Sequence, residues 1–361
     1  MRPQITWNMA AGSERYNFSF SPFRILMMAV LDMSTKVVAT FPFWMTAIGI
    51  YALLRSGFAW RLAIDEPNQR SLHVRPTPRV GGIVLVPAFL AMWLAASLIG
   101  TQMVLLVAGL CVMSYFDDRA GMPVALRLIG HLAVAILFVL FVLGIRDFFW
   151  CVTWGLAIVW LTNLYNFMDG LDGLAGGMAL SGFFSYGWVA AFSDMEFSYA
   201  CWSVAAAAAG FLVFNFPPAK VFMGDAGSIP LGFLAAGLGL LGWRQGLWPL
   251  WFPLLVFSPF VVDASVTLLL RLVRGERVWQ AHREHYYQRL IRMGWSHRRT
   301  ALAEYALMAA TAGSALAALG TKPARQTLIL ALWCGIYLGL MATVDRRWRR
   351  FVQTPGAGDR G

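Results

Sequence analysis

Residues 163–177 read Asn-Leu-Tyr-Asn-Phe-Met-Asp-Gly-Leu-Asp-Gly-Leu-Ala-Gly-Gly, and apolar sequence continues on both sides of them. Ionisable groups between two hydrophobic segments are costly in a bilayer and mark candidate functional sites. Asn166 and Asp169 are three positions apart and should share a helical face, on which Asp172 follows one turn later. The glycines between these acids break the helix or let a second backbone approach closely. A plain glycine-rich turn is the alternative, but it does not explain why acids and amides alternate with the glycines.

The composition places the chain in a membrane. Of its 361 residues 59% are hydrophobic and 13% are charged, and the mean hydropathy is +0.62. These values exclude an ordinary soluble domain and predict an all-α polytopic protein with a single helical bundle. The net charge of +11 does not indicate nucleic acid binding, because the basic residues stand in short loops between apolar runs. The four cysteines lie inside apolar runs without CxxC spacing, so we expect small core residues and neither disulfides nor metal ligands.

Apolar segments divide the chain into eleven predicted spans, which gives a bundle of about 10–11 transmembrane helices. They cover residues 38–54, 81–99, 102–116, 128–144, 150–167, 173–193, 199–216, 228–243, 247–270, 301–319 and 326–343. Residues 1–36 are expected to be a variable lead-in or the product of a mis-assigned start codon. Residues 37–345 then form the transmembrane domain, and residues 346–361 form a basic cytoplasmic tail.

The basic residues indicate which loops share a membrane face. Alternate loops, with the C-terminal tail, hold 21 Lys and Arg residues, whereas the loops on the other side hold four. By the positive-inside rule the first set is cytoplasmic, which places the N-terminus outside and the C-terminus inside. The polar link at 168–172 belongs to the inside set. Every polar cluster described below is therefore predicted to emerge on the cytoplasmic face.

Two adjacent acids, Asp117 and Asp118, follow the third span directly. A helix end terminated by charges is the plain alternative for this pair. Two neighbouring carboxylates repel each other, however, and need a cation or a basic partner close by. A metal ion, a substrate or Arg127 would supply that positive charge.

A further acid, Asp225, stands in the sequence Met-Gly-Asp-Ala-Gly-Ser at 223–228, where the eighth span begins. An N-cap is the simpler interpretation of an aspartate in this position. The same geometry leaves backbone N–H groups free, which suits a phosphate. Carboxylate and amide oxygens from separate helices also suit Mg²⁺, because this ion takes few protein ligands together with substrate phosphates.

Two loops on the same predicted face are rich in basic residues. The loop 271–300 holds eight arginines and the run His282-Arg283-Glu284-His285, whose histidines are predicted to share a helical face. Zinc is disfavoured because no cysteine or third ligand is near. The alternatives are an interfacial helix on anionic lipid and a loop that binds phosphate. In the loop 67–82, which its prolines keep extended, Arg79 serves either membrane topology or phosphate contact.

Taken together, these motifs resemble the polyprenyl-phosphate N-acetylhexosamine-1-phosphate transferases of glycosyltransferase family 4. The resemblance covers residues 40–345 and rests on five ordered motifs: the Pro-Thr-Pro-Arg-x-Gly-Gly loop, Asp117-Asp118, Asn166 to Gly173, Met223-Gly224-Asp225 and His282-Arg283-x-x-His285. The last motif looks closest to the bacterial branch that initiates O-antigen synthesis. Gly121 occupies the lysine position of the family's Asp-Asp-x-x-Lys motif, and Arg127 is the candidate substitute.

The resemblance implies an enzyme that transfers a sugar 1-phosphate from a UDP-linked N-acetylated sugar to undecaprenyl phosphate. The expected place is the cytoplasmic face of the bacterial inner membrane, and the expected pathway is lipopolysaccharide or other cell-wall polysaccharide synthesis. Mg²⁺ is the implied cofactor, with Mn²⁺ as the alternative. The small-residue faces of the predicted helices would also suit a homodimer. The implied roles are metal binding for Asn166 and Asp225, catalysis for Asp117 and Asp118, and substrate binding for Asp169, Asp172, His282, Arg283, His285, Arg79 and Arg127.

A secondary transporter or lipid carrier is the main alternative from another class. Intramembrane acids and glycine-broken helices are also typical of transporters, which place polar groups near mid-span and contain inverted repeats. Here the acids stand at the ends of spans on one face, and the sequence shows no convincing internal repeat. The pattern therefore favours the transferase.

Overall fold

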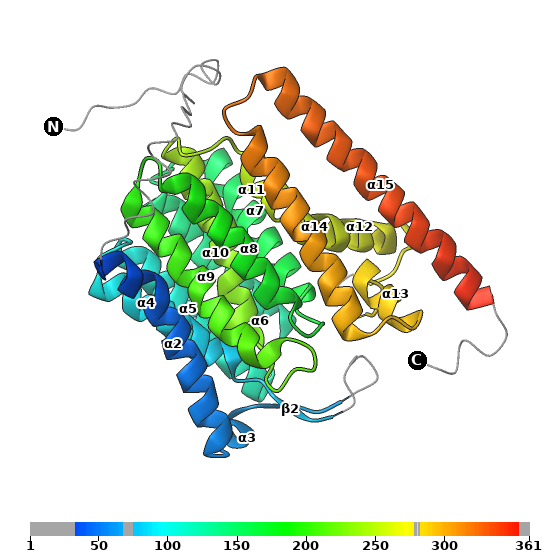
Figure 1. The fold of residues 1–361 in the computed structure, drawn as a ribbon, viewed down its shortest axis with the longest axis horizontal. Helices are drawn as coiled ribbons and strands as arrows, with labels where there is room; N and C mark the ends of the chain where they lie inside the picture. The colour runs from blue at the N-terminus through cyan, green and yellow to red at the C-terminus, as the bar shows by residue number, and fades with distance from the viewer. Residues whose placement is uncertain (1–32, 68–74, 278–279, 281, 354–361) are drawn as a thin grey trace.

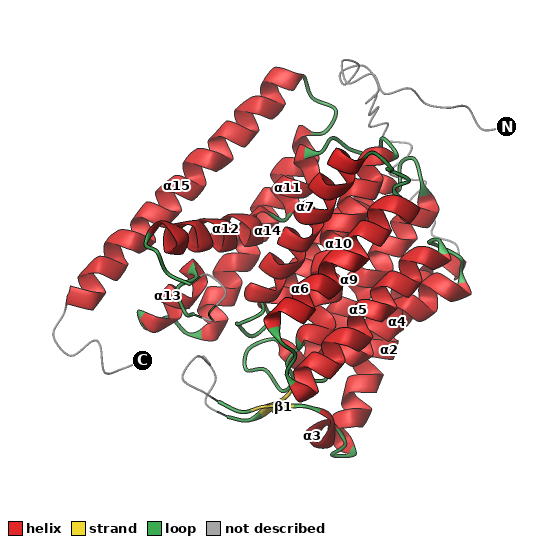
Figure 2. Ribbon diagram, turned by 180° about the vertical axis from the view of Figure 1, so that it is seen from behind, coloured by secondary structure: helices red, strands yellow, loops and turns green. Residues whose placement is uncertain are grey.

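The computed structural model describes residues 33–67, 75–277, 280 and 282–353 (Figure 1). Most of the predicted lead-in lies outside the described residues, and its last four positions already belong to the first helix. Figure 2 shows that helices make up most of the described chain, with one small pair of strands. The all-α prediction is confirmed.

In chain order the helices are α2 (Met33–Arg55), α3 (Ala59–Leu62), α4 (Gly81–Ala95), α5 (Thr101–Ala120), α6 (Val124–Leu137), α7 (Phe148–Phe167), α8 (Leu174–Ala190), α9 (Met195–Asn215), α10 (Asp225–Arg244), α11 (Trp251–Val256), α12 (Ser258–Val273), α13 (Tyr286–Arg292), α14 (His297–Ala318) and α15 (Pro323–Gln353). A π-helical turn, η1 (Phe138–Val142), continues α6. The strands β1 (Ile64–Asp65) and β2 (Thr77–Pro78) pair antiparallel. Each predicted span overlaps at least one of these helices.

Six helical segments of the described chain are long and apolar enough to cross a bilayer: α6 with η1, α7, α9, α10, α14 and α15. Large apolar side chains cover the outer surface of these helices. Phe148 is 82% exposed, Leu338 is 70% exposed and Phe141 is 68% exposed. Apolar surface of this kind is expected where lipid, not water, surrounds the helices. The chain is a polytopic membrane protein.

The ninth predicted span, 247–270, is wrong in one respect, because the chain bends between α11 and α12. Pro259 lacks the N–H that would bond to the carbonyl of Leu255, and the Ser258 hydroxyl donates to that carbonyl instead, at 2.7 Å. Ser258 Oγ also lies 2.7 Å from the hydroxyl of Tyr337 in α15. In Figures 1 and 2, α12 accordingly crosses the direction of α15. The bend leads the chain toward α13.

Helix α10 is the centre of the bundle. Sixteen of its 20 residues are buried, and it packs against α4, α5, α7 and α8. Its glycines allow close approach, since a Cβ on Gly232 would lie 2.8 Å from the carbonyl oxygen of Thr162 in α7. Phe233 fills the space on another side, with its ring 5.4 Å from that of Phe138. Because α10 begins where α5 and α7 end, this packing gathers three polar helix ends at one end of the bundle.

The last helix reaches beyond the predicted transmembrane domain. Its 31 residues correspond to about 46 Å at 1.5 Å per residue, which exceeds the hydrocarbon thickness of about 30 Å. Residues 346–353 of the predicted tail therefore continue α15. At this end of the helix Asp345 forms an ion pair of 2.8 Å with Arg289 of α13.

Candidate active site

The polar ends of α7 and α10 meet directly. The Asn166 amide at the end of α7 donates a hydrogen bond of 2.9 Å to Asp225 Oδ1 at the start of α10. The same amide nitrogen donates to Ser228 Oγ, also at 2.9 Å. The two residues assigned to a metal are thus neighbours although 59 positions separate them in the sequence. Their role as ligands stays a prediction.

Arg127 connects the first acidic pair to Asp225. Its Nη1 atom lies 3.1 Å from Asp117 Oδ2 and 3.6 Å from Asp225 Oδ2. Asp117 is buried, and its Oδ1 accepts the N–H of Met122 at 2.6 Å, which fixes this carboxylate at the end of α5. The structure thus brings Arg127 to the place where the acidic pair was expected to need a cation.

Asp118 holds the first turn of α10. Its Oδ2 atom accepts the N–H of Ala226 at 3.0 Å, which satisfies a donor that the helix itself leaves free. Arg79 Nη1 lies 3.8 Å from Asp118 Oδ1, and Arg79 also pairs with Asp65. The arginine of the proline-rich loop therefore belongs to the same cluster as the acids.

Backbone hydrogen bonds fasten the proline-rich loop to the start of α10. Three bonds of 2.8–2.9 Å join residues 78–82 to residues 222–223. Gly82 packs against Gly227 so closely that a Cβ on Gly82 would lie 2.2 Å from the Gly227 nitrogen. Two of the predicted motifs are therefore one structural unit.

We expect Gly82→Ala to destabilise the purified protein by about 1–3 kcal/mol, because the added methyl group would displace backbone atoms rather than a flexible side chain. Thermal unfolding in detergent measures the effect. Gly109→Ala in α5 is the matched control, since no atom lies within 4 Å of a Cβ at that position. Equal melting temperatures for the two variants would contradict the close packing described for Gly82.

Asp169 lies in the link after α7, close to the acids at the helix ends. Burial raises the pKa of Asp169 well above its usual range, and the carboxylates of Asp225 and Asp118 raise it further. Arg79 opposes this effect but does not cancel it. Asp169 therefore lies in a buried setting close to the carboxylates of Asp225 and Asp118.

Asp172 has different partners. It accepts the N–H of Ala219 at 3.0 Å and lies 3.4 Å from His297 Nδ1. The prediction that Asp172 continues the helical face of Asn166 is wrong, because α7 ends one residue after Asn166 and Gly173 adopts a left-handed φ of +79°. In this structure Asp172 joins the link after α7 to the loop at Ala219 and to the first residue of α14, and a nucleotide-binding role for it stays a prediction.

The His-Arg motif has two differently placed histidines. His285 is buried, and its Nδ1 lies 3.1 Å from Asp263. His282 is half-buried, and burial, aided by the nearby His285 and Arg271, lowers the pKa of His282 to about 3. His282 is therefore neutral at pH 7. The positive charge of the motif comes from Arg283, whose side chain forms no hydrogen bond or ion pair with the residues that the structure describes.

The prediction that His282 and His285 share a helical face is wrong, because α13 begins only after His285. Two tyrosines nevertheless bring this region to the link after α7. The hydroxyl of Tyr287 donates to the carbonyl of Phe167 at 3.4 Å, and that of Tyr305 donates to the carbonyl of Gly173 at 2.8 Å. The expectation that the basic loop and the acids lie at the same end of the bundle is met.

Known proteins of similar sequence carry out chemistry that suits this cluster. The family described as Glycosyl transferase family 4 matches residues 100–242. A decaprenyl-phosphate N-acetylglucosaminephosphotransferase of Mycobacterium leprae is 31% identical over 342 residues, which cover 80% of this chain and 84% of the relative. The chain belongs to the polyprenyl-phosphate N-acetylhexosamine-1-phosphate transferase family.

Two further relatives of this transferase differ in their substrates. A probable undecaprenyl-phosphate N-acetylglucosaminyl 1-phosphate transferase of Bacillus subtilis is 30% identical over 267 residues, covering 67% of this chain and 74% of the relative. A phospho-N-acetylmuramoyl-pentapeptide-transferase of Listeria welshimeri is 27% identical over 275 residues, covering 66% of this chain and 82% of the relative. The resemblance stated from the motifs is confirmed, and the coarse activity is that of a membrane sugar-1-phosphate transferase.

The site of the transferase suits a divalent cation. Among the described residues, the four carboxylates of Asp117, Asp118, Asp169 and Asp225 lie near two guanidinium groups, those of Arg79 and Arg127. Carboxylate and amide oxygens are ligands that Mg²⁺ prefers, and a half-turn of the Asn166 amide presents its oxygen where its nitrogen now stands. Within the described residues, no three His, Cys, Asp or Glu side chains form a metal cage.

Sequence reasoning missed three polar residues of this transferase. Ser228 stands three positions after Asp225, and this helical spacing was a usable signal. Asp263 is a lone acid within a predicted span, which by itself marks a functional candidate. Asp65, the partner of Arg79, gave no signal, because its loop contact depends on the strand pair.

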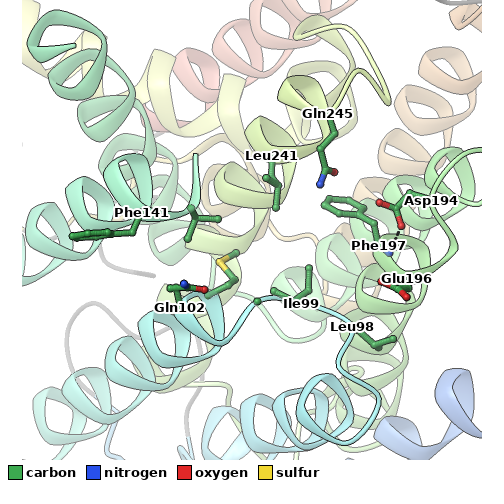
Figure 3. A pocket seen from close by; sticks show the side chains of 12 residues that line it. Leu98, Ile99, Gln102, Phe141, Asp194, Glu196, Phe197, Leu241 and Gln245 are labelled. Atoms are coloured by element: carbon green, nitrogen blue, oxygen red, sulfur yellow. Dashed lines mark hydrogen bonds between the residues drawn. The ribbon is translucent and has the colours of Figure 1, made fainter. Parts of the chain in front are cut away.

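A cavity of about 310 Å³ lies beside the start of α5, the start of α9 and the end of α10 (Figure 3). It is lined by Leu98, Ile99, Gly100, Gln102, Met103, Phe141, Val142, Asp194, Glu196, Phe197, Leu241 and Gln245. Gln102 and Met103 lie at the start of α5 and Leu241 lies at the end of α10, whereas the acids lie at the other ends of these helices. The length of a 20-residue helix, about 30 Å, therefore separates the cavity from the acids. The cavity therefore does not border the acidic cluster.

Proposed function

We propose that this transferase moves the sugar 1-phosphate of UDP-N-acetylglucosamine, or of a related UDP-linked N-acetylated sugar, onto undecaprenyl phosphate. The products are undecaprenyl-diphospho-sugar and UMP, and the lipid product begins O-antigen or another cell-envelope polysaccharide. The meeting of Asp117, Asn166 and Asp225 around Arg127 carries this proposal. The donor is suggested by the names of the Bacillus and Mycobacterium relatives, both of which specify N-acetylglucosamine.

The reaction joins two anions. An oxygen of the lipid phosphate attacks the β-phosphorus of the UDP-sugar, and a new P–O bond forms. The bond between that phosphorus and the bridging oxygen breaks, so UMP leaves with the oxygen. Repulsion between the reactants must be offset, as in other phosphoryl transfers. Mg²⁺ held by Asn166 and Asp225 would neutralise charge on the diphosphate.

Side chains of the protein position the lipid phosphate and the UDP-sugar. Asp117, fixed by a backbone N–H and by Arg127, organises the attacking lipid phosphate through that arginine. Arg79 lies beside Asp118 at the start of α10 and attracts the incoming phosphates. Arg283, which has no partner among the described residues, is available for the sugar diphosphate. Asp169 borders the same space from the link after α7.

An apolar cavity of about 220 Å³ supports a lipid substrate. Residues of α7, α8, α10, α11 and α12 line it, among them Leu161, Phe257 and Val261. Leu161 precedes Asn166 by five residues, which is about 7.5 Å along α7. A polyprenyl chain in this cavity would place its phosphate beside the acids.

Incubation of the purified protein with undecaprenyl phosphate, Mg²⁺ and a panel of UDP-sugars tests the proposal. We expect one donor to give undecaprenyl-diphospho-N-acetylhexosamine, identified by mass, with equimolar UMP. Chelation by EDTA should stop the reaction, and Mg²⁺ or Mn²⁺ should restore it. Uptake of the UDP-sugar into proteoliposomes without any lipid-linked product would instead favour the transporter.

The active end of the bundle is proposed to face the cytoplasm of a bacterial inner membrane. The distribution of Lys and Arg between alternate loops supports this orientation. The homodimer predicted from the sequence stays a prediction.

A further inference from the structure

One buried acid lies outside the acidic cluster and binds the His-Arg motif. Asp263 of α12 is 6% exposed. Its Oδ1 accepts the N–H of Tyr286 at 3.0 Å, and its Oδ2 accepts the N–H of Tyr287 at 3.2 Å. The hydroxyl of Thr267 also donates to Oδ1, at 3.2 Å. Both oxygens of Asp263 are therefore acceptors, and they hold the start of α13 against α12.

The same carboxylate fixes the tautomer of a histidine. His285 Nδ1 lies 3.1 Å from Asp263 Oδ1. Since Oδ1 already accepts two hydrogens and carries none, the proton of this contact must be on Nδ1. His285 then presents Nε2 as its reactive nitrogen. Carboxylates that orient histidines in this way are often as important as the histidine itself.

A chain of contacts links this histidine to the acids. The ring of Tyr287 stacks on that of His285, with centroids 5.9 Å apart and an interplanar angle of 12°. The hydroxyl of Tyr287 donates to the carbonyl of Phe167, which is next to Asn166. A shift of Asp263 would therefore move His285 relative to the proposed metal ligands.

Capping of α13 alone does not explain a charged residue here. The Gln288 side chain already accepts the N–H of His285, at 3.2 Å, at the start of α13. A neutral asparagine or serine caps a helix about as well as aspartate. An ionisable group within a predicted span is costly, so its presence calls for a further role. The contact that a neutral cap would not reproduce is the one with the His285 ring.

We propose that Asp263 is a positioning residue for sugar-phosphate transfer, which holds His285 in its Nδ1–H tautomer and leaves Nε2 free for the sugar diphosphate. The inference rests on the proposed function, because it assigns the substrate contact to His285. It adds a residue that none of the five motifs contains.

A double-mutant cycle separates positioning from simple support. Asp263→Asn is expected to lower kcat about 10–100-fold, with little change in melting temperature. In a His285→Ala background the same substitution should cost less than about threefold, because the group through which it acts is gone. Glu304→Gln is the matched control, since this half-buried carboxyl in α14 forms no hydrogen bond within the described chain, and its kcat should be unchanged.

Losses that multiply in the double variant would overturn the proposal, because Asp263 would then act independently of His285. If Asp263→Asn does not fold, Asp263→Glu replaces it in the same cycle, since the longer side chain keeps the charge but moves the carboxylate away from the ring.

A second readout does not need activity. In protein labelled with ¹⁵N-histidine, the His285 signal is assigned among five histidines by its loss in His285→Gln. The wild type should show protonated Nδ1, and Asp263→Asn should change the tautomer. An unchanged tautomer would overturn the positioning role. Absence of transfer with every UDP-sugar, together with the expected tautomer change, would instead reject the proposed function alone.

Discussion

Asp225→Asn is expected to reduce sugar-phosphate transfer by about 100-fold or more, because it removes the charge proposed to hold Mg²⁺. The amide keeps the size of the side chain and a hydrogen-bonding partner for Asn166, which now donates to Asp225 at 2.9 Å. Membrane insertion and yield should therefore be unchanged. UMP release, measured over a range of Mg²⁺ concentrations, should show both a lower maximum and a higher requirement for the ion.

Glu196→Gln is the matched control for this experiment. It makes the same change from carboxylate to amide, but at an exposed residue near the cavity at the opposite end of the bundle. Its rate should equal that of the wild type. Full activity of Asp225→Asn would refute the assignment of Asp225 as a metal ligand, even if the reaction itself is confirmed.

Arg127→Ala is expected to lower kcat/KM about 100-fold, the scale of losing one preorganised group that stabilises developing charge. The variant lacks the guanidinium group that lies 3.1 Å from the Asp117 carboxylate and 3.6 Å from the Asp225 carboxylate. Repulsion between these acids and the substrate phosphates would then rise. Steady-state kinetics with varied UDP-sugar and varied lipid phosphate measure the loss for each substrate.

Arg119→Ala is the control for Arg127, since Arg119 is exposed and its side chain contacts only Tyr115, at 3.2 Å, among the described residues. Its effect should stay within about twofold, as for other surface changes. Arg127→Lys should recover part of the activity, because a lysine keeps the charge that the family's motif supplies at another position. Equal losses for Arg127→Ala and Arg119→Ala would remove Arg127 from the mechanism.

The membrane class and most helices follow from local sequence. Long apolar runs must form helices in lipid, where every backbone N–H and C=O needs an internal partner. That constraint acts within each segment, so α7 and α10 appear close to their predicted positions. The helix break at Pro259 could also have been predicted, because a proline inside a helix removes a backbone hydrogen bond.

The contacts within the candidate site could be predicted only in part from the sequence. Asp117, Asn166 and Asp225 could be nominated by their types and spacing, but the bridge through Arg127 depends on how α5, α6 and α10 pack. The partners of Asp172 could not be read from helical spacing, because the turn after α7 redirects its side chain.

By itself, the sequence determined that this chain crosses a membrane as helices, that it belongs with the sugar-1-phosphate transferases, and which acids and basic loops to examine. Hydropathy and motif order are properties of the sequence itself, so they can be evaluated without a tertiary structure. Only the tertiary structure decided that Asp263 holds His285, that Asp118 secures α10 and that Asp172 joins the link after α7 to the start of α14. Those contacts depend on distances between segments far apart in the chain, which packing of the whole bundle sets.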